Sequence, residues 1–201
     1  MSVSLQKGQR VNLTKEHPGL KKVVVGLGWD AAERTKKKGI LSSLHNTEGA
    51  SIDCDASAIL LKGGKICDSD DVVYYGNLSH ESKSVRHLGD NLTGNGDGDD
   101  EQIRINLAKV PAEYDKVAIV VNIYKCKERH QDFGVIKNAF IRVVDEKSGE
   151  ELCKYSLSEN YSGMTAMIFG ELYRDGNEWK FAASGQGTKD TSIKQLCRHF
   201  M

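Results

Sequence analysis

The segment from Asp90 to Glu101 carries the most distinctive chemistry in the chain. Its sequence, DNLTGNGDGDDE, holds four Asp, one Glu and three Gly, and it has no Lys or Arg. Carboxylates this close repel one another by about 1 kcal/mol per pair at ~4 Å even in water, so the segment resists compaction unless a cation joins it. Glycine tolerates positive φ angles, which lets backbone carbonyl oxygens turn toward one point. These features predict a calcium loop, because Ca²⁺ takes about 6–8 oxygen ligands in flexible geometry whereas Zn²⁺ prefers Cys and His.

The spacing of this loop does not fit three familiar motifs. An EF-hand that started at Asp90 would place Leu92 at its third position and Asn95 at its sixth, where the motif requires an oxygen ligand and a Gly. The G-x-G-x-G of the loop is followed by QIRINL, which alternates like a strand and offers no helix N-terminus to a pyrophosphate. Calcium-binding nonapeptides occur in tandem, and this chain has one copy. The remaining alternative to a metal site is a solvated acidic turn between two strands.

A second acidic pair lies in the segment 51–61, SIDCDASAILL. A strand here would separate the side chains onto two faces, with Asp53, Asp55 and Ser57 on one and Ile52, Cys54, Ala56 and Ala58 on the other. Strands usually avoid Asp, so the pair needs an explanation. It either marks an edge strand whose charged face lies in water or supplies oxygens to the same calcium shell as the loop.

Length and charge limit the classes of function. The 201 residues correspond to a single domain, 1–201, large enough to bury a substantial core. The 28 basic and 28 acidic residues cancel, so we expect no nucleic-acid partner and no attraction to an anionic membrane. Neither a signal peptide nor an apolar run of about 20 residues is present in the sequence, so we expect a cytoplasmic protein with no transmembrane segment. The five cysteines are odd in number and form no C-x-x-C pair, which indicates reduced and mostly buried thiols.

Short runs of alternating apolar and polar residues dominate the rest of the chain. They predict about ten strands separated by turns, which is typical of a β-sandwich. A first hairpin would join Val3 and Leu5 to Val11 and Leu13 around Lys7 and Gly8. The other strands are expected at 23–29, 51–61, 72–76, 102–107, 117–124, 138–145, 152–157, 165–174 and 178–185. With short helices at 129–137 and 193–200, the expected fold is an all-β, two-sheet β-sandwich with one or two short helices.

The chain resembles the TerD family of calcium-binding tellurium-resistance and stress-response proteins along nearly its whole length. The matching pieces are VSLQKGQRVNLTK near the N-terminus, VVVGLGWD at 23–30, DCDASA at 53–58, GDNLTGNGDGDDE at 89–101, RHQDFGVIKNAFIRVVD at 129–145 and GELYRDGNEWKFAASGQG at 170–187. The resemblance implies a two-sheet sandwich, two neighbouring Ca²⁺ ions and a role in resistance to tellurite and other stresses. The chain departs from the family pattern in a long basic connection with Arg34, Lys36, Lys37 and Lys38, which we interpret as a solvated loop rather than a phosphate-binding patch.

The resemblance also carries over a set of metal ligands, residue by residue. They are Asp53, Asp55, Asp90, Asn91, Gly94, Gly96, Asp97, Asp99, Asp100 and Glu101, with Asp30 as a further candidate. The two glycines would contribute backbone oxygens. The implied function is a binding or scaffold module that holds about two Ca²⁺ and has other tellurite-resistance proteins as partners.

An enzyme or a redox protein that handles tellurite directly is the alternative. The six histidines are scattered, and neither H-E-x-x-H nor G-x-S-x-G occurs in the sequence. His80 and His87 flank the approach to the loop, where we expect exposed and inert side chains rather than metal-linked ones. A direct redox role would require a reactive, exposed cysteine.

Overall fold

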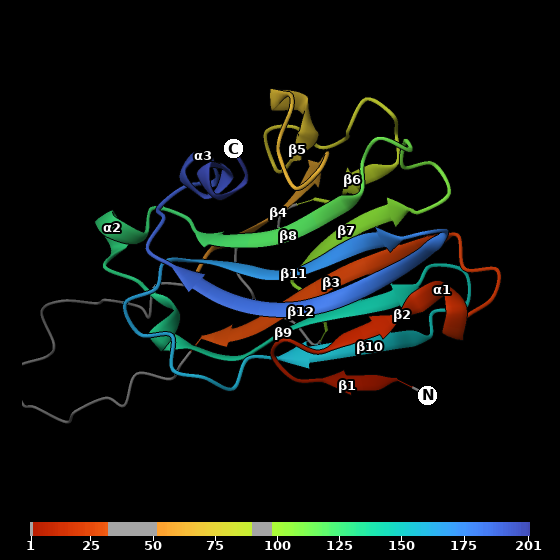
Figure 1. Ribbon diagram of the computed structural model, residues 1–201. Helices are drawn as coiled ribbons and strands as arrows, with labels where there is room; N and C mark the ends of the chain where they lie inside the picture. Colours follow the sequence, from red (N-terminus) through yellow and green to blue (C-terminus); the bar gives the residue numbers. More distant parts are fainter. Residues whose placement is uncertain (1, 32–51, 90–97) are drawn as a thin grey trace, which may run out of the picture.

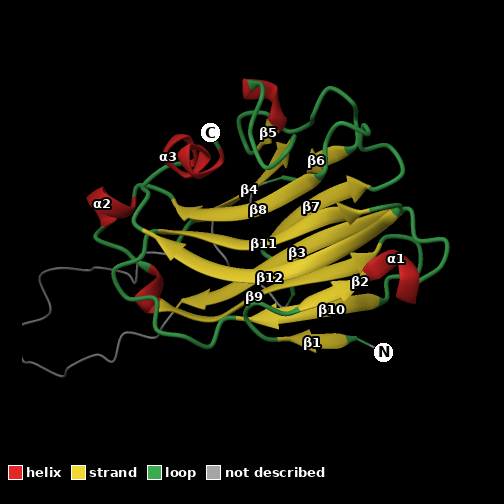
Figure 2. Ribbon diagram, in the orientation of Figure 1, coloured by secondary structure: helices red, strands yellow, loops and turns green. Residues whose placement is uncertain are grey.

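Two β-sheets of six strands each pack face to face in the computed structural model, which describes residues 2–31, 52–89 and 98–201 (Figures 1 and 2). Sheet A contains, in spatial order, β1 (Val3–Leu5), β10 (Glu151–Ser156), β9 (Ile136–Asp145), β3 (Lys22–Ala31), β7 (Glu101–Asn106) and β6 (Val85–His87). Sheet B contains β2 (Arg10–Asn12), β12 (Glu178–Thr188), β11 (Ala166–Asp175), β8 (Lys116–Ile123), β4 (Cys54–Leu61) and β5 (Val72–Val73). The predicted all-β sandwich is confirmed.

The helical segments that the structure describes are one turn or little more. They are α1 (Leu13–Glu16), η2 (Ser69–Asp71), α2 (Cys126–Arg129), η3 (Phe133–Val135), α3 (Ile193–Leu196) and η4 (Cys197–Phe200). The last two form the helical C-terminal segment that the sequence predicts, and they lie against the outer face of sheet B (Figure 1). None of the helices within the described residues is long and apolar enough to cross a membrane.

The main core fills the space between the sheets, and a second cluster lies on the outside of sheet B. Strand β7 alternates as expected, with Ile103 and Ile105 in the core and Arg104 exposed. Strands β4 and β8 are instead buried almost throughout, because the C-terminal segment covers their outer face with Leu196 and Phe200. This double burial explains their nearly continuous apolar sequences.

Three local predictions are wrong. Strands β1 and β2 do not form a hairpin, because β1 pairs in parallel with β10 in sheet A and β2 pairs with β12 in sheet B. The helix expected at 129–137 is absent: α2 ends at Arg129, His130 adopts a left-handed φ of 50°, and β9 begins at Ile136. The strand expected at 72–76 is only Val72–Val73 long.

Replacing Leu196 by Ala tests whether the C-terminal segment is part of the folded unit. Leu196 is fully buried in the outer cluster, so Leu196→Ala should lower the free energy of unfolding by about 2–5 kcal/mol. The neighbouring Lys194 is exposed, and Lys194→Ala should change it by less than about 0.5 kcal/mol. Urea unfolding followed by tryptophan fluorescence measures both, and equal effects of the two changes would contradict the packing described.

Candidate metal site

The two acidic segments meet beside the thiol of Cys54. Strand β4 begins at Cys54 in sheet B, strand β7 begins at Glu101 in sheet A, and the two strands contact each other across the sandwich. The pKa of Cys54 is held well above its usual value, first by burial and then by the negative charges of Asp55, Asp53, Glu101 and Asp100. The negative charges of two acidic segments far apart in the sequence therefore act on one core thiol. All four are buried, with exposed fractions of 6% for Asp53, 6% for Asp55, 8% for Asp100 and 1% for Glu101.

Asp53 and Asp55 lie at the start of β4, which is not a solvated edge strand. Register pairs Asp55 with Asn122 on β8, and the Asn122 Nδ2 donates to Asp55 Oδ2 at 3.1 Å. The Arg129 Nη1 donates to Asp53 Oδ2 at 3.4 Å, and the Asp53 carbonyl accepts from the Tyr124 N–H at 2.8 Å. The predicted separation of faces is confirmed, since Cys54 and its apolar neighbours lie in the main core. The alternative of a charged face in water is wrong, because both carboxylates are buried.

Asp100 is fixed against β3 by two hydrogen bonds. Its Oδ2 accepts from the Trp29 N–H at 2.8 Å, and its own N–H donates to the Leu27 carbonyl at 2.7 Å. Burial raises the pKa of Asp100, and the nearby charges of Asp30 and Asp99 raise it further, against the opposing effect of the Trp29 hydrogen bond. The carboxylate thus sits where a negative charge is costly, which favours a bound cation.

Asp99 lies over the outer face of sheet A, where its charge still raises the pKa of its neighbour Asp100. Its Oδ1 forms an ion pair with Arg142 Nε at 2.7 Å, and its Oδ2 accepts from Gln102 Nε2 at 3.1 Å. Gly26 makes room for it, because a Cβ at this position of β3 would collide with the Asp99 carboxylate. Asp30, the further candidate, accepts a hydrogen bond from Asn138 Nδ2 at 2.7 Å.

His87 connects the two ends of the acidic loop. Its Nε2 lies 3.0 Å from Glu101 Oε2, and both side chains are almost completely buried. Its Nδ1 accepts a hydrogen bond from the N–H of Gly89 at 3.2 Å. The ring thus lies against the Glu101 carboxylate through Nε2 and holds the backbone of Gly89 through Nδ1. One imidazole thereby ties the residue just before the loop to the residue that ends it.

The two histidines were expected to be exposed, and that prediction is wrong. His80, like His87, is buried, and it belongs to a separate polar cluster: its Nδ1 lies 2.6 Å from Ser82 Oγ and its Nε2 lies 3.7 Å from Asp71 Oδ1. Asp71 also accepts from the Tyr114 hydroxyl at 2.5 Å. Burial acts to raise the pKa of Asp71, but the hydrogen bonds from Tyr114 and from the backbone of Asp68 and Cys67 bring it below its usual value.

The remaining predicted ligands lie outside the residues that the structure describes. These are Asp90, Asn91, Gly94, Gly96 and Asp97. Within the described ranges, no three His, Cys, Asp or Glu side chains form a group that could hold a metal ion by themselves. The charges of Asp53, Asp55, Asp100 and Glu101 all act on Cys54, but the described part does not gather these side chains into one ligand group, and it pairs Asp99 with Arg142. Its donor set is made of carboxylate oxygens, which fit a hard cation such as Ca²⁺.

Sequence reasoning missed the polar groups that hold the carboxylates. Asn122 had a detectable signal, because it is a single amide inside the apolar run VAIVVNI. Arg129 and Arg142 had none, since their contacts depend on how distant segments come together, and the sequence places His87 beside the loop without indicating its contact with Glu101.

Comparison with known proteins identifies the family. Residues 1–200 match the TerD domain. The chain is 52% identical over 201 residues to the stress response protein SCP2 of Bacillus subtilis (strain 168), covering 100% of both chains. It is 48% identical over 188 residues to the tellurium resistance protein TerD of Serratia marcescens, covering 93% of this chain and 91% of the other. The chain therefore belongs to the TerD family, whose named members here are stress-response and tellurium-resistance proteins.

A solved structure shows the same fold. The crystal structure of a TerD homologue from Streptomyces coelicolor A3(2) superposes with a TM-score of 0.63 at 21% identity, covering 88% of this chain and 95% of that one. At this identity the likeness concerns the fold alone.

The His87–Glu101 contact can be measured by a double-mutant cycle. His87→Ala removes the imidazole that contacts a buried carboxylate and that accepts from Gly89, so it should cost about 1–3 kcal/mol of unfolding free energy. In the Glu101→Gln background the same change should cost at least about 0.5 kcal/mol less, because the partner charge is gone. Strictly additive effects in chemical unfolding would contradict the contact, and His17→Ala, remote from the loop in the sequence, serves as the control.

Proposed function

We propose that this protein is a calcium-binding member of the TerD family, in which the start of β4 and the acidic loop before β7 hold Ca²⁺ together. The observation that carries the proposal is that four buried carboxylates from both segments, Asp53, Asp55, Asp100 and Glu101, act with their charges on the same thiol, that of Cys54. Ca²⁺ commonly takes carboxylate oxygens from more than one segment, in a shell that tolerates irregular geometry. The undescribed loop residues Asp90, Asn91, Gly94, Gly96 and Asp97 would complete a set sufficient for about two ions.

The electrostatics of the described residues support a cation at this place. Buried carboxylates close to one another repel, and burial itself disfavours their charged form. A divalent ion would neutralise two of these charges and allow the loop to compact. Cys54 would not be a ligand, because its thiol lies in the core with a strongly raised pKa and calcium prefers oxygen. Asp99 would have to leave Arg142 in order to join the shell.

We assign the protein a role as a cytoplasmic binding or scaffold module in stress response rather than a catalytic one. The named relatives are stress-response and tellurium-resistance proteins. Thiol catalysis is disfavoured at three of the five cysteines: burial raises the pKa of Cys54 and Cys197, and it raises that of Cys153 to about 12. Partners of this module would be other tellurite-resistance proteins, which recognise the calcium-ordered loop.

Calcium should stabilise the folded protein. At a free Ca²⁺ concentration about 100 times the Kd, binding to the native state alone adds roughly 2.7 kcal/mol, so excess chelator should lower the melting temperature measured by calorimetry. An identical melting curve with and without chelator would sink the calcium proposal.

The metal preference follows from the flexible carboxylate set. Isothermal titration of chelator-treated protein should show about two Ca²⁺ per chain and weaker binding of Mg²⁺, because Mg²⁺ demands a near-ideal octahedron at about 2.0–2.1 Å. Equal affinity for the two ions would contradict this geometry.

Asp55→Asn separates a metal ligand from an ordinary buried carboxylate. The variant keeps an oxygen that can accept from Asn122, but it removes one negative charge from the cluster. It should weaken Ca²⁺ binding at least about tenfold, yet leave the stability in chelator unchanged or higher, because it relieves repulsion in the empty site. Asp175→Asn, at an exposed position paired with Lys180, is the matched control and should leave Ca²⁺ affinity unchanged. A destabilised Asp55→Asn protein with normal calcium affinity would assign Asp55 a purely structural role.

A further inference from the structure

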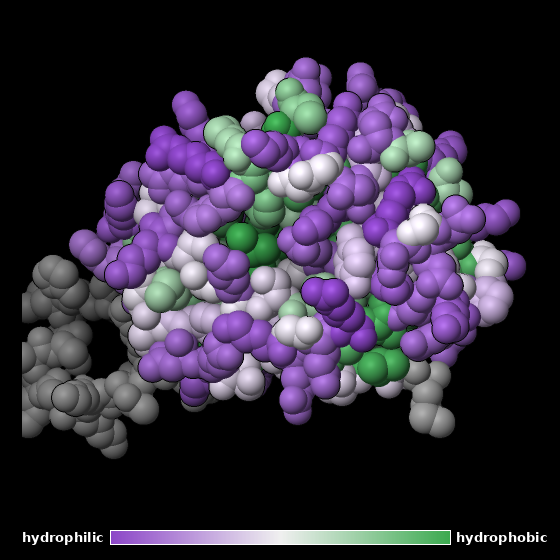
Figure 3. Space-filling model, viewed as in Figure 1, coloured by the Kyte–Doolittle hydropathy of each residue, from purple (hydrophilic) through white to green (hydrophobic). Residues whose placement is uncertain are grey.

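A cavity with sulfur-bearing residues in its lining lies on the outer side of sheet B, and none of Asp53, Asp55, Asp100 and Glu101 lines it. It has a volume of about 460 Å³ and separates the segment 66–74 from the C-terminal helices α3 and η4. Three sulfur-bearing residues line it, namely Cys67, Cys197 and Met201. The other walls are largely apolar and include Ile66, Val72, Tyr74 and Ile193. In the space-filling view, hydrophobic residues show between α3 and β5 within a mainly hydrophilic surface (Figure 3).

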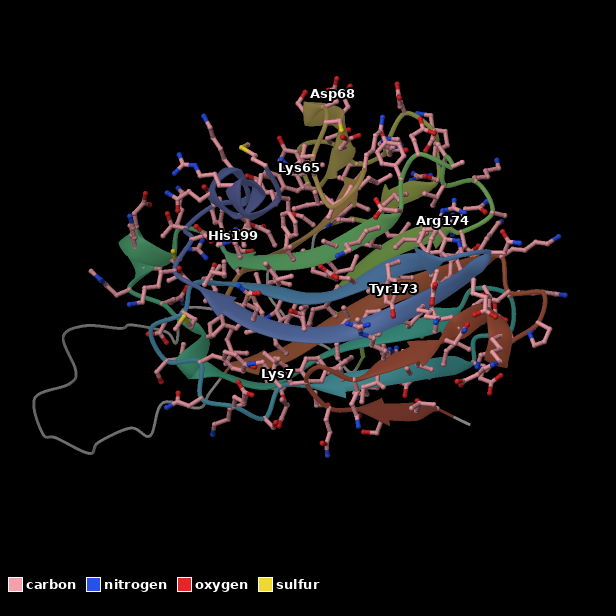
Figure 4. The ribbon with its side chains drawn as sticks, viewed as in Figure 1. Lys7, Lys65, Asp68, Tyr173, Arg174 and His199 are labelled. Atoms are coloured by element: carbon pink, nitrogen blue, oxygen red, sulfur yellow. The ribbon has the colours of Figure 1, made fainter. Side chains whose placement is uncertain are left out.

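The two sides of the cavity are held in place by backbone contacts. The Ile66 N–H donates to the Phe200 carbonyl at 2.8 Å, which joins the segment before β5 to the end of the chain. The Cys67 N–H donates to Asp71 Oδ2 at 2.9 Å, and Asp71 is itself buried. Cys197 belongs to the outer hydrophobic cluster of sheet B. Figure 4 shows Lys65 and Asp68, which lie on either side of Ile66 and Cys67, on the segment next to the helix that carries His199. Both cysteines therefore come from anchored backbone.

The thiols of Cys67 and Cys197 differ in their exposure to solvent. Both are free, Cys67 being exposed and Cys197 buried at 8%. Burial raises the pKa of Cys197, so this group is a protonated thiol when nothing is bound. Met201 is 73% exposed and lines the same cavity. The cavity thus joins two sulfur-bearing side chains that solvent reaches, Cys67 and Met201, to a buried one, Cys197.

We propose that this cavity is a binding site for a soft metal ion such as Cu(I), with the sulfurs of Cys67 and Cys197 as principal ligands and the thioether of Met201 as a third. Thiolate and thioether sulfur select soft ions, whereas the oxygen-rich region around Cys54 selects hard ones. On binding, two metal–thiolate bonds and one metal–thioether bond form, each thiol releases its proton to water, and no electron is transferred. The site does not depend on the calcium proposal, because it shares no residue with it.

The test is an anaerobic titration of the whole protein with Cu(I), in competition with a chromophoric Cu(I) chelator and with Ca²⁺ in excess. The native protein should bind one Cu(I). Cys67→Ser and Cys197→Ser should each weaken binding at least about tenfold, since each removes one of two thiolate ligands, and Met201→Leu should have a smaller effect. Cys153→Ser, at a fully buried core position, should bind as the native protein does. Native affinity in Cys67→Ser, or an equal loss in Cys153→Ser, would overturn the proposal.

A second measurement uses the native protein, so it does not require the Cys197→Ser variant to fold. In the native protein, Cu(I) should slow the modification of both Cys67 and Cys197 by N-ethylmaleimide, as read by mass spectrometry of peptides. Protection of both thiols supports the two-sulfur site. Protection of Cys67 alone would show that Cu(I) binds a single surface thiol, and protection of neither thiol would show that Cu(I) does not bind at this cavity. Either result would overturn the two-sulfur site.

Discussion

The burial of negative charges where β4 and β7 begin is the constraint on which the rest of this structure depends. Asp53 and Asp55 flank Cys54 in the sequence of one sheet, Asp100 and Glu101 lie where β7 begins in the other, and all four charges act on the Cys54 thiol. Such an arrangement would open the sandwich at this place if nothing opposed the repulsion. An amide from β8, an arginine from α2 and a backbone N–H from β3 donate hydrogen bonds to three of these carboxylates, and the imidazole of His87 on β6 lies against the fourth.

These contacts also explain why the acidic loop joins rigid elements at both ends. His87 ends β6, Glu101 starts β7, and the ring of His87 contacts Glu101 through Nε2 and accepts a hydrogen bond from Gly89 through Nδ1. The loop between them is therefore closed at its base whatever its own conformation. Because residues 89 and 101 are already held by one side chain, a ligand that binds the loop has less conformational entropy to remove.

The sequence predicts what depends on local periodicity and misses what depends on distant partners. The two faces of 51–61 and the strands around 117–124 and 178–185 follow from alternation and agree with the structure. The pairing of β1 and β2 does not follow, because three-residue strands carry too little pattern to choose a sheet. The expected helix at 129–137 fails for a local reason: the left-handed His130 ends α2, and the Asp132 side chain accepts from Gly134 N–H at 2.7 Å to start a separate turn. Among the candidate ligands, Asp99 could not be told from Asp100 by sequence, because only the position of Arg142 on β9 separates their surroundings.

The placement of the first two strands has a consequence for how the chain is completed during synthesis. β1 adds to the edge of one sheet against Glu151–Ser156, and β2 adds to the edge of the other against Glu178–Thr188. Residues 3–12 therefore cannot pair in either sheet until strands more than a hundred residues further along the sequence have been synthesised. Once they pair, one short stretch of chain joins the edges of both sheets. These two edge contacts therefore complete the sandwich late, after β12 has been synthesised.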